Sequence, residues 1–222
     1  DVRAGEIVGF FGLVGAGRTE IMRALFGVDK YDSGSVSVSG KPLRGHSVTQ
    51  AIKNGIGFAT EDRKSEGLAL RLSILVNMTI VKLPQFARGG VINRKKQSTA
   101  ADDYVDSISI KTPSVAQLAG NLSGGNQQKV VVAKWLMMEP KVLILDEPTR
   151  GIDVGSKSEI YGLIGELAKQ GVAVVVVSSE LEEILGICDK VHVIHEGKLV
   201  DTLDASTAST QEVLTSAFGG VS

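Results

Sequence analysis

Hydrophobic and polar residues follow one another along the chain in a pattern that predicts alternating strands and helices. Residues 7–11, 142–145 and 172–177 are short, continuous apolar runs, which are typical of strands buried on both faces of a sheet. Residues 157–169 repeat their apolar positions at helical spacing and predict a helix with one buried face. Because a helix between two fully apolar strands indicates a crossover between parallel strands, the pattern predicts an α/β fold with a mostly parallel sheet.

Shorter segments predict further strands. Residues 35–39 alternate between polar and apolar side chains, as a half-buried strand does, and residues 55–59 form another short apolar run. Residues 191–194 and 198–202 flank a Glu-Gly pair, which is typical of a hairpin. We therefore expect a hairpin to close one edge of the sheet.

The middle of the chain has a different pattern, in which charged and small residues alternate with helical stretches. Asn93 directly precedes one such stretch, at residues 94–106, and asparagine is a preferred residue at a helix N-cap. The sequence therefore predicts two parts. Residues 1–61 and 142–222 are expected to form the sheet-containing core, and residues 62–141 a helical subdomain with its connecting segments.

Composition excludes several classes of protein. A hydrophobic fraction of 43% over 222 residues is enough for a sizeable core and excludes a mainly disordered chain. The 24 basic and 25 acidic residues nearly cancel, which gives no support to a nucleic-acid-binding protein. The single cysteine, Cys188, excludes an internal disulfide and a cysteine-based zinc site. Without an apolar stretch of the ~18–20 residues that a membrane span needs, or an N-terminus like a signal peptide, we expect a soluble protein of a reducing compartment.

A glycine-rich segment at residues 12–19 follows the first predicted strand and precedes a helix predicted at residues 20–26. It reads Gly-Leu-Val-Gly-Ala-Gly-Arg-Thr, the spacing of the phosphate-binding motif G-x-x-x-x-G-K-[ST], with arginine in place of lysine. Backbone N–H groups of such a loop, and of the helix that follows, face phosphate oxygens. The residues predicted to bind a nucleotide here are Gly12, Gly15, Ala16, Gly17, Arg18, Thr19 and Glu20.

An acid pair, Asp146 and Glu147, ends the apolar run at 142–145. After a phosphate loop, this pattern matches a Walker B motif. Asp146 would hold Mg²⁺ together with the hydroxyl of Thr19, and carboxylate and hydroxyl oxygens suit this ion. Glu147 would orient or deprotonate the attacking water, so Asp146 and Glu147 are the candidate catalytic residues.

A third motif, Leu-Ser-Gly-Gly-Asn-Gln-Gln, lies at residues 122–128, about twenty residues before the acid pair. It opens a predicted helix that Ser123 can cap, and Gly124 and Gly125 permit a phosphate to approach the backbone. This segment resembles the signature of ATP-binding-cassette (ABC) ATPases, and the three motifs in this order make the resemblance specific. It implies a P-loop NTPase (RecA-like) core with a helical subdomain, ATPase activity with ATP and Mg²⁺, and a nucleotide contact by Gln127.

The resemblance covers nearly the whole chain and identifies three departures from the family pattern. Arg18 replaces lysine, Glu61 stands where the family has a switch glutamine, and Ser179 stands where it has a histidine that senses the γ-phosphate. Glu61 could still bind Mg²⁺ or water through its carboxylate. Residues 149–153 resemble the D-loop, with Asp153 as its acid. ABC domains work as head-to-tail pairs, so the pattern implies a degenerate ATP site in this domain and an unaltered signature for a partner's site.

The three motifs together are similar to the second, C-terminal cassette of tandem sugar importers of the ribose, galactose and xylose type. The resemblance implies a second cassette in the same longer chain, membrane permease subunits, a periplasmic sugar-binding protein and no nucleic acid. The location implied is the cytoplasmic face of the cell membrane, with the permease contact at residues 61–84. Only eleven residues precede Gly12, so the first strands of a whole cassette are expected to be missing.

Two alternatives remain open at this point. The departures at Arg18, Glu61 and Ser179 also fit a regulatory nucleotide-binding domain that does not hydrolyse ATP, so activity of the isolated domain is expected to be weak or absent. A soluble ABC ATPase acting on DNA or ribosomes is the other alternative, although neither coiled-coil arms nor a basic surface is evident.

Overall fold

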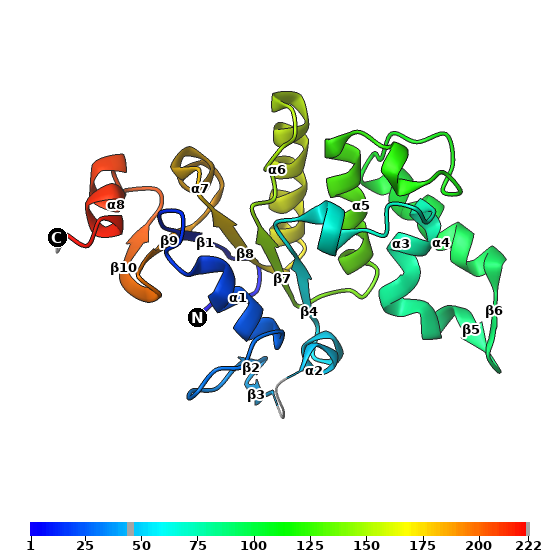
Figure 1. The fold of residues 1–222 in the computed structure, drawn as a ribbon, viewed down its shortest axis with the longest axis horizontal. Coiled ribbons are helices and arrows are strands. Elements are labelled where there is room, and N and C mark those ends of the chain that lie inside the picture. Colours follow the sequence, from blue (N-terminus) through cyan, green and yellow to red (C-terminus); the bar gives the residue numbers. More distant parts are fainter. Residues whose placement is uncertain (44–46, 221–222) are drawn as a thin grey trace. The chain divides into compact units, whose positions relative to one another are not determined.

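Six strands form the central sheet, in the order β10-β9-β1-β8-β7-β4 (Figure 1). The computed structural model describes residues 1–43 and 47–220. Strand β1 pairs in parallel with β8 and β9, and β7 pairs in parallel with β8, whereas β10 is antiparallel to β9. The strands are β1 (Ile7–Phe11), β4 (Ile56–Ala59), β7 (Val142–Asp146), β8 (Ala173–Ser178), β9 (Lys190–His195) and β10 (Lys198–Asp204). The expected α/β fold with a mostly parallel sheet is confirmed.

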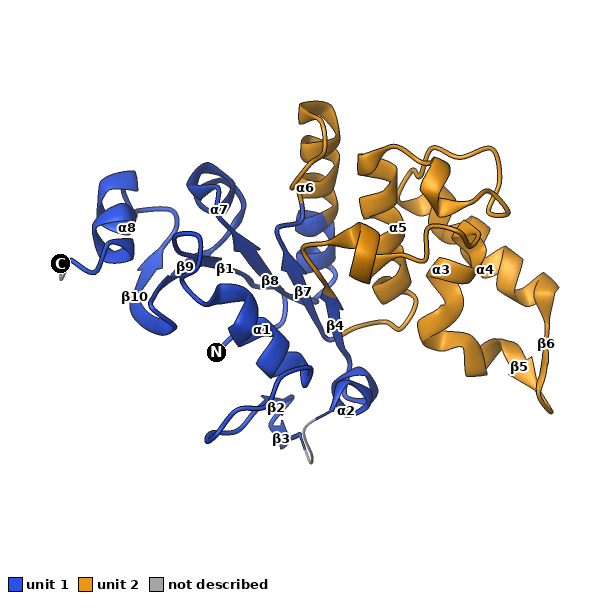
Figure 2. Ribbon diagram, in the orientation of Figure 1, with its two compact units in different colours: residues 1–58, 141–148, 164–222 blue, residues 59–140, 149–163 orange. Residues whose placement is uncertain are grey.

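The chain divides into two compact units (Figure 2). Unit 1 contains residues 1–58, 141–148 and 164–222, and unit 2 contains residues 59–140 and 149–163. The predicted division at residues 61 and 142 differs from these units chiefly in residues 149–163, which it assigned to the core.

Unit 1 is built around strands that are buried on both faces. Every residue of β8 is buried, as are four of the five residues of β1 and of β7. Helix α1 ends where predicted, because Gly27 adopts φ 84 and its N–H bonds back to the last turn. The other helices wholly within unit 1 are α2 (Val48–Lys53), α7 (Leu181–Ile187) and α8 (Thr210–Ala217), beside α1 (Arg18–Phe26).

Two hairpins occur in the described part of unit 1, and one of them was predicted. Strands β9 and β10 form the hairpin expected at 191–194 and 198–202. The strand expected at 35–39 shrinks to β2 (Ser37–Val38), which pairs with β3 (Lys41–Pro42). Ser39 and Gly40, with φ 51 and 72, end it in a tight turn.

Unit 2 is mostly helical, as expected. Asn93 accepts a hydrogen bond from the N–H of Lys96 and so caps α4, which confirms the predicted cap. In the described part of the chain, no helix combines the length and apolar character needed to cross a bilayer. The elements are η1 (Arg63–Gly67, a π-helical turn), α3 (Ile74–Thr79), η2 (Ile80–Phe86), β5 (Ala87–Arg88), β6 (Val91–Ile92), α4 (Arg94–Ser107), η3 (Ala119–Asn121), α5 (Gly124–Leu136) and the first part of α6 (Val154–Lys169).

Lys134 is a buried cation in the middle of unit 2. It is 9% exposed, its Nζ donates to the carbonyl oxygen of Gly67 at 2.7 Å, and burial lowers its pKa to about 8. The unfolded chain therefore binds the proton more tightly than the folded chain between about pH 8 and 10.5, so folding becomes more favourable as the pH rises through this range.

We expect the wild-type protein to gain up to about 3 kcal/mol in unfolding free energy relative to Lys134→Met between pH 7.5 and 10.5. Urea unfolding of both proteins at several pH values measures this difference. Parallel pH profiles for the two proteins would contradict a buried, titrating lysine.

Candidate functional site

Three strands of unit 1 bring predicted site residues to one edge of the sheet. In the parallel register, Phe11 lies opposite Ser178 and Asp146 lies opposite Val177. Gly12, Glu147 and Ser179 directly follow these strand ends. The carboxyl edge of a parallel sheet is the usual place for a ligand site. The structure thus brings residues from separate sequence motifs together at one such edge.

Two glycines of the 12–17 loop, Gly12 and Gly17, are required by their surroundings in unit 1. A Cβ at Gly12 would overlap the carbonyl oxygen of Ile194. Gly17 has φ 92, and a Cβ there would lie 3.0 Å from the Cα of Gly197. The N–H of Gly197 also donates to the carbonyl of Ala16 at 2.7 Å. The turn between β9 and β10 therefore braces the loop from outside.

The loop leads directly into the first turn of α1, which begins at Arg18. The first N–H groups of a helix have no intrahelical acceptor, and they favour an anion. Gly15 has φ 83, and a Cβ there would meet no atom within 4 Å, so the loop leaves open space at that residue. This arrangement can bind phosphate.

Arg18 turns toward the acid pair. Its Nη1 lies 3.3 Å from Oε1 of Glu147, and both side chains are 10% exposed. Glu147 itself has φ 47, a left-handed conformation that costs a non-glycine residue roughly 1–2 kcal/mol. Strained residues of this kind cluster at functional sites. The arginine that replaces lysine is thus the counter-ion of the predicted catalytic glutamate.

Asp146 has the properties of a cation ligand. It is 1% exposed, and no hydrogen bond of good geometry reaches either carboxylate oxygen. Burial raises its pKa to about 6, an effect that the adjacent Thr19 hydroxyl opposes. The carboxylate of Asp146 and the hydroxyl of Thr19 would supply two oxygen ligands beside the phosphate loop. This set fits Mg²⁺, which usually completes its shell with phosphate oxygens and waters.

Two other predicted residues of unit 1 are exposed. Glu20 lies in the first turn of α1, and Ser179 directly follows β8. The hydroxyl of the preceding residue, Ser178, accepts a hydrogen bond from the N–H of Glu180 at 3.0 Å. Ser179 thus lies at the end of β8, which pairs with β1, the strand that leads into the 12–17 loop. Its place just after the apolar run at 172–177 predicts this position.

The remaining predicted residues lie in unit 2. The carboxylate of Glu61 forms an ion pair with the guanidinium of Arg150, which follows the acid pair by three residues. A contact from Glu61 to Mg²⁺ or water would have to share this carboxylate with Arg150.

The signature glycines are required by packing inside unit 2. A Cβ at Gly124 would lie 2.9 Å from Nη2 of Arg63 and 3.1 Å from the carbonyl oxygen of Gly151. A Cβ at Gly125 would overlap Oγ of Ser156 and lie 2.5 Å from its Cβ. The predicted reason for these glycines was the approach of a phosphate. The structure adds a second reason, which is the close contact of α5 with residues 151–156.

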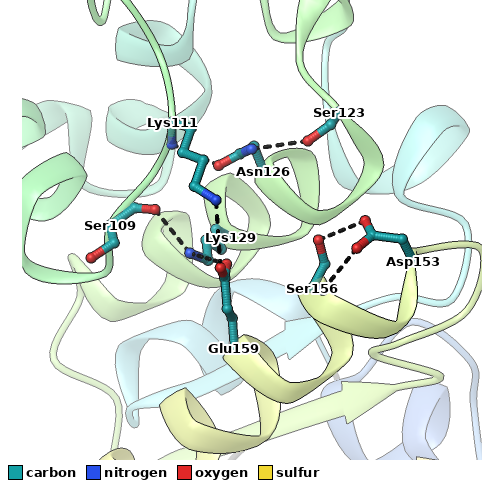
Figure 3. A network of polar contacts seen from close by, with 8 residues as sticks. All are labelled: Ser109, Lys111, Ser123, Asn126, Lys129, Asp153, Ser156 and Glu159. Carbon is teal, nitrogen blue, oxygen red and sulfur yellow. Dashed lines mark hydrogen bonds and ion pairs between the residues drawn. The ribbon is translucent and has the colours of Figure 1, made fainter.

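Ser123 occupies the N-cap position of α5, but its side chain does not cap the helix, so this part of the prediction was wrong. Its Oγ instead accepts a hydrogen bond from Nδ2 of Asn126 at 2.9 Å (Figure 3). Oδ1 of Asn126 accepts from the N–H of Lys111 at 2.7 Å. The serine hydroxyl therefore leaves the first N–H groups of α5 without this cap.

A network of charged side chains joins α5 to α6 (Figure 3). Nζ of Lys129, which is buried, lies 2.8 Å from Oε2 of Glu159 and donates to the carbonyl of Ser109 at 2.8 Å. At the start of α6, Asp153 accepts from both the N–H and the hydroxyl of Ser156, and this hydroxyl bond lowers the pKa of Asp153. The signature and the loop that contains Asp153 are thus parts of one packed assembly.

Gln127 was predicted to touch the nucleotide, but it is 4% exposed and donates to the carbonyl of Ala119 at 3.2 Å, so such a contact would require this bond to break.

Sequence patterns missed two residues that these contacts identify, Asn126 and Arg63. Asn126 contacts Ser123 directly. Arg63 was also missed, and the only signal was its position two residues after Glu61.

Comparisons with known proteins agree with this geometry. The sequence profile of the family described as "ABC transporter" matches residues 1–150. Over 219 residues, the chain is 51% identical to the ribose import ATP-binding protein RbsA of Lactococcus lactis, covering 99% of this chain and 44% of that protein. It is 51% identical over 220 residues to a putative ribose/galactose/methyl galactoside import ATP-binding protein of Rhizobium etli, covering 99% and 42%. The chain thus spans somewhat less than half the length of these curated relatives.

Solved structures share the fold. A dimeric ATP-binding cassette in a post-hydrolysis state, bound to ADP and Pi, matches with a TM-score of 0.79 at 21% identity, over 94% of this chain and 89% of that chain. The cassette cbiO1 of Clostridium perfringens, part of the ABC transporter complex cbiONQ, matches with a TM-score of 0.77 at 24% identity, over 98% and 83%. Both have the P-loop NTPase architecture predicted from the motifs. The chain belongs to the ABC transporter family.

Proposed function

We propose that this chain is the ATP-binding domain of a bacterial sugar importer and couples ATP binding and hydrolysis, ATP + H₂O to ADP + phosphate, to carbohydrate uptake. The observation that carries the proposal is the convergence of the glycine loop, Thr19 and the acid pair at one edge of the sheet. The names of its relatives, which are ribose and ribose/galactose/methyl galactoside import proteins, support a sugar as cargo.

In this proposal, the 12–17 loop and the first turn of α1 bind the phosphates of ATP. Thr19 and Asp146 would hold Mg²⁺, which when bound neutralises charge on the phosphate oxygens. Glu147 orients the attacking water once it is released from Arg18. Because Arg18, Glu61 and Ser179 depart from the family pattern, the chain's own site is proposed to be degenerate.

The signature is proposed to serve a partner's site. Ser123, Gly124, Gly125, Gln127 and Asp153 would face the nucleotide of a second cassette, which in a tandem protein is part of the same longer chain. Solved cassettes of this fold include dimers, which supports pairing. Membrane permease subunits would bind at residues 61–84 and place the domain at the cytoplasmic face of the membrane, with a periplasmic sugar-binding protein acting through them.

A regulatory domain that binds ATP without hydrolysis is the second candidate, and the Arg18–Glu147 ion pair favours it, because the catalytic carboxylate is already engaged. ATP turnover separates the two candidates. We expect little turnover from the chain alone and a clear increase when a second cassette with an ordinary lysine loop is added. Turnover of about 1 s⁻¹ or more by the chain alone would contradict a degenerate site. ATP binding without an increase in the mixture would favour the regulatory candidate.

Ser123→Ala tests the division of labour between the two sites. Turnover of the mixture should fall about tenfold, the kinetic equivalent of one lost hydrogen bond, because the hydroxyl would act on the partner's nucleotide. The affinity of this chain for ATP should stay within about twofold, since in this proposal Ser123 acts on the partner's nucleotide and not on the one bound by residues 12–19. Ser98→Ala, which also removes a hydroxyl bonded to a neighbour, is the matched control and should change neither quantity. Weaker ATP binding in Ser123→Ala would contradict the assignment.

A further inference from the structure

Arg63 is a charged side chain of unit 2 that no motif explains. It is 9% exposed, and it begins the π-helical turn η1 directly after Glu61 and Asp62. Its Nη1 donates to the carbonyl oxygen of Arg150 at 2.6 Å, and its Nη2 donates to the carbonyl oxygen of Gly151 at 3.0 Å. A guanidinium offers donors in a rigid plane, so one side chain can hold two consecutive carbonyls.

The same guanidinium lies against the start of the signature helix. Nη2 of Arg63 would be 2.9 Å from a Cβ at Gly124, the first residue of α5. The carbonyl of Gly151, which Nη2 binds, would be 3.1 Å from the same Cβ. Arg63 therefore fills the corner between the 149–152 loop and α5, a corner that exists because residue 124 has no side chain.

The neighbours of Arg63 support its position. Oδ1 of Asp62 accepts hydrogen bonds from the N–H groups of Lys64 and Ser65 at 2.9 and 3.1 Å, which fixes the turn that carries Arg63. Glu61 pairs with the guanidinium of Arg150, so the loop is held through its side chain as well as its backbone. The Glu61–Arg150 pair is partly exposed and contributes little alone. The buried Arg63 is the main link.

We propose that Arg63 is a positioning residue, which holds the carbonyls of Arg150 and Gly151 beside the first residue of the signature helix. It would thereby keep Ser123 and Asp153 in the fixed relation that the partner's site requires. This inference rests on the proposed function for its catalytic consequence, but not for the contact itself. It also gives Glu61 a role as the counter-ion of Arg150. Because Arg63 belongs to the segment expected to contact the permease, this link joins that segment to the residues facing the partner.

The first test measures the contact alone. Hydrogen exchange of the full chain should be at least tenfold faster in residues 149–152 and 124–126 of Arg63→Met than in the wild type, because methionine fills the space but donates nothing. The exchange rate of Arg63→Lys should lie between those of Arg63→Met and the wild type, since one ammonium group cannot hold both carbonyls in a plane. Unchanged exchange in these residues would overturn the proposal.

The second test measures its consequence in the mixture with a lysine-loop cassette. Arg63→Met should lower kcat for ATP at least tenfold, with KM and the chain's own ATP affinity within about twofold, and Arg63→Lys should recover part of the loss. Tyr104→Phe is the matched control, because it also removes a side-chain donor to a carbonyl of unit 2, that of Leu136, without touching η1. An equal loss of kcat in Tyr104→Phe would overturn the positioning role and indicate general destabilisation. If the wild-type mixture shows no turnover, the proposed function fails, and exchange alone decides the inference.

Discussion

Replacing Arg18 with lysine should tighten ATP binding by about tenfold, which corresponds to about 1.4 kcal/mol. In the wild type, the guanidinium is paired with Glu147 in a site where both side chains are 10% exposed, so phosphate has to compete with a buried carboxylate. A lysine ammonium is a compact charge that can turn toward the phosphates. Fluorescence titration with a labelled ATP analogue, with and without Mg²⁺, measures the change.

Two further variants make the result for Arg18 specific. Arg23→Lys is the matched control, because Arg23 is another arginine of α1 paired with a carboxylate, that of Asp29, and its replacement should not alter ATP affinity. Arg18→Met should bind ATP more weakly than Arg18→Lys, since it frees Glu147 but supplies no charge. Equal affinities in the wild type and Arg18→Lys would refute the assignment of residues 12–19 as the phosphate loop.

Gly125→Ala should destabilise unit 2 by about 1–3 kcal/mol and reduce partner-dependent turnover. The new Cβ would overlap Oγ of Ser156 and lie 2.5 Å from its Cβ, and such overpacking costs free energy in this range. A different rotamer of Ser156 can move Oγ but not Cβ, so α5 and α6 would have to separate. Thermal unfolding and ATP turnover of the mixture together measure both effects.

A second substitution at the point of overlap tests this explanation. Ser156→Gly removes both overlapping atoms, and the nearest remaining atom of residue 156, its Cα, is 3.8 Å from the new methyl group. The double variant should therefore recover much of the stability, apart from about 1 kcal/mol for glycine in a helix. Gly162→Ala, where a Cβ meets no atom within 4 Å, is the control and should be neutral or stabilising. A double variant as unstable as Gly125→Ala would show that the overlap is not the cause.

Local patterns were enough to predict the sheet and the first half of the site. Strands β1, β7 and β8 are continuous apolar runs with few alternatives, and the loop at 12–17 needs glycines whose spacing is visible in the sequence. The parallel direction of the strands followed from the alternation of strands and helices, because parallel strands require crossovers, whereas their order in the sheet was not predicted. The register places the loop and the acid pair at the same edge of the sheet.

The parts that were not predicted depend on contacts between distant residues. The cap of α5 by Ser123 failed because Asn126 competes for the hydroxyl, and Asn126 is held in turn by Lys111. Residues 149–163 join unit 2 because Arg63 and Lys129 bind them, and neither bond has a signature in the sequence. The ion pair of Arg18 with Glu147 spans 129 positions and could not be foreseen from either motif alone.

The bond between the N–H of Gly197 and the carbonyl of Ala16 has a consequence for synthesis of the chain on the ribosome. The turn that braces the phosphate loop is made roughly 180 residues after the loop itself, which takes about 10–40 s at usual translation rates. Strand β1 likewise waits for both of its neighbours, β8 and β9. The nascent chain is thus unable to complete its nucleotide site until the turn between β9 and β10 has been made, and in that interval the apolar β1 strand depends on chaperones or on early helix packing for protection.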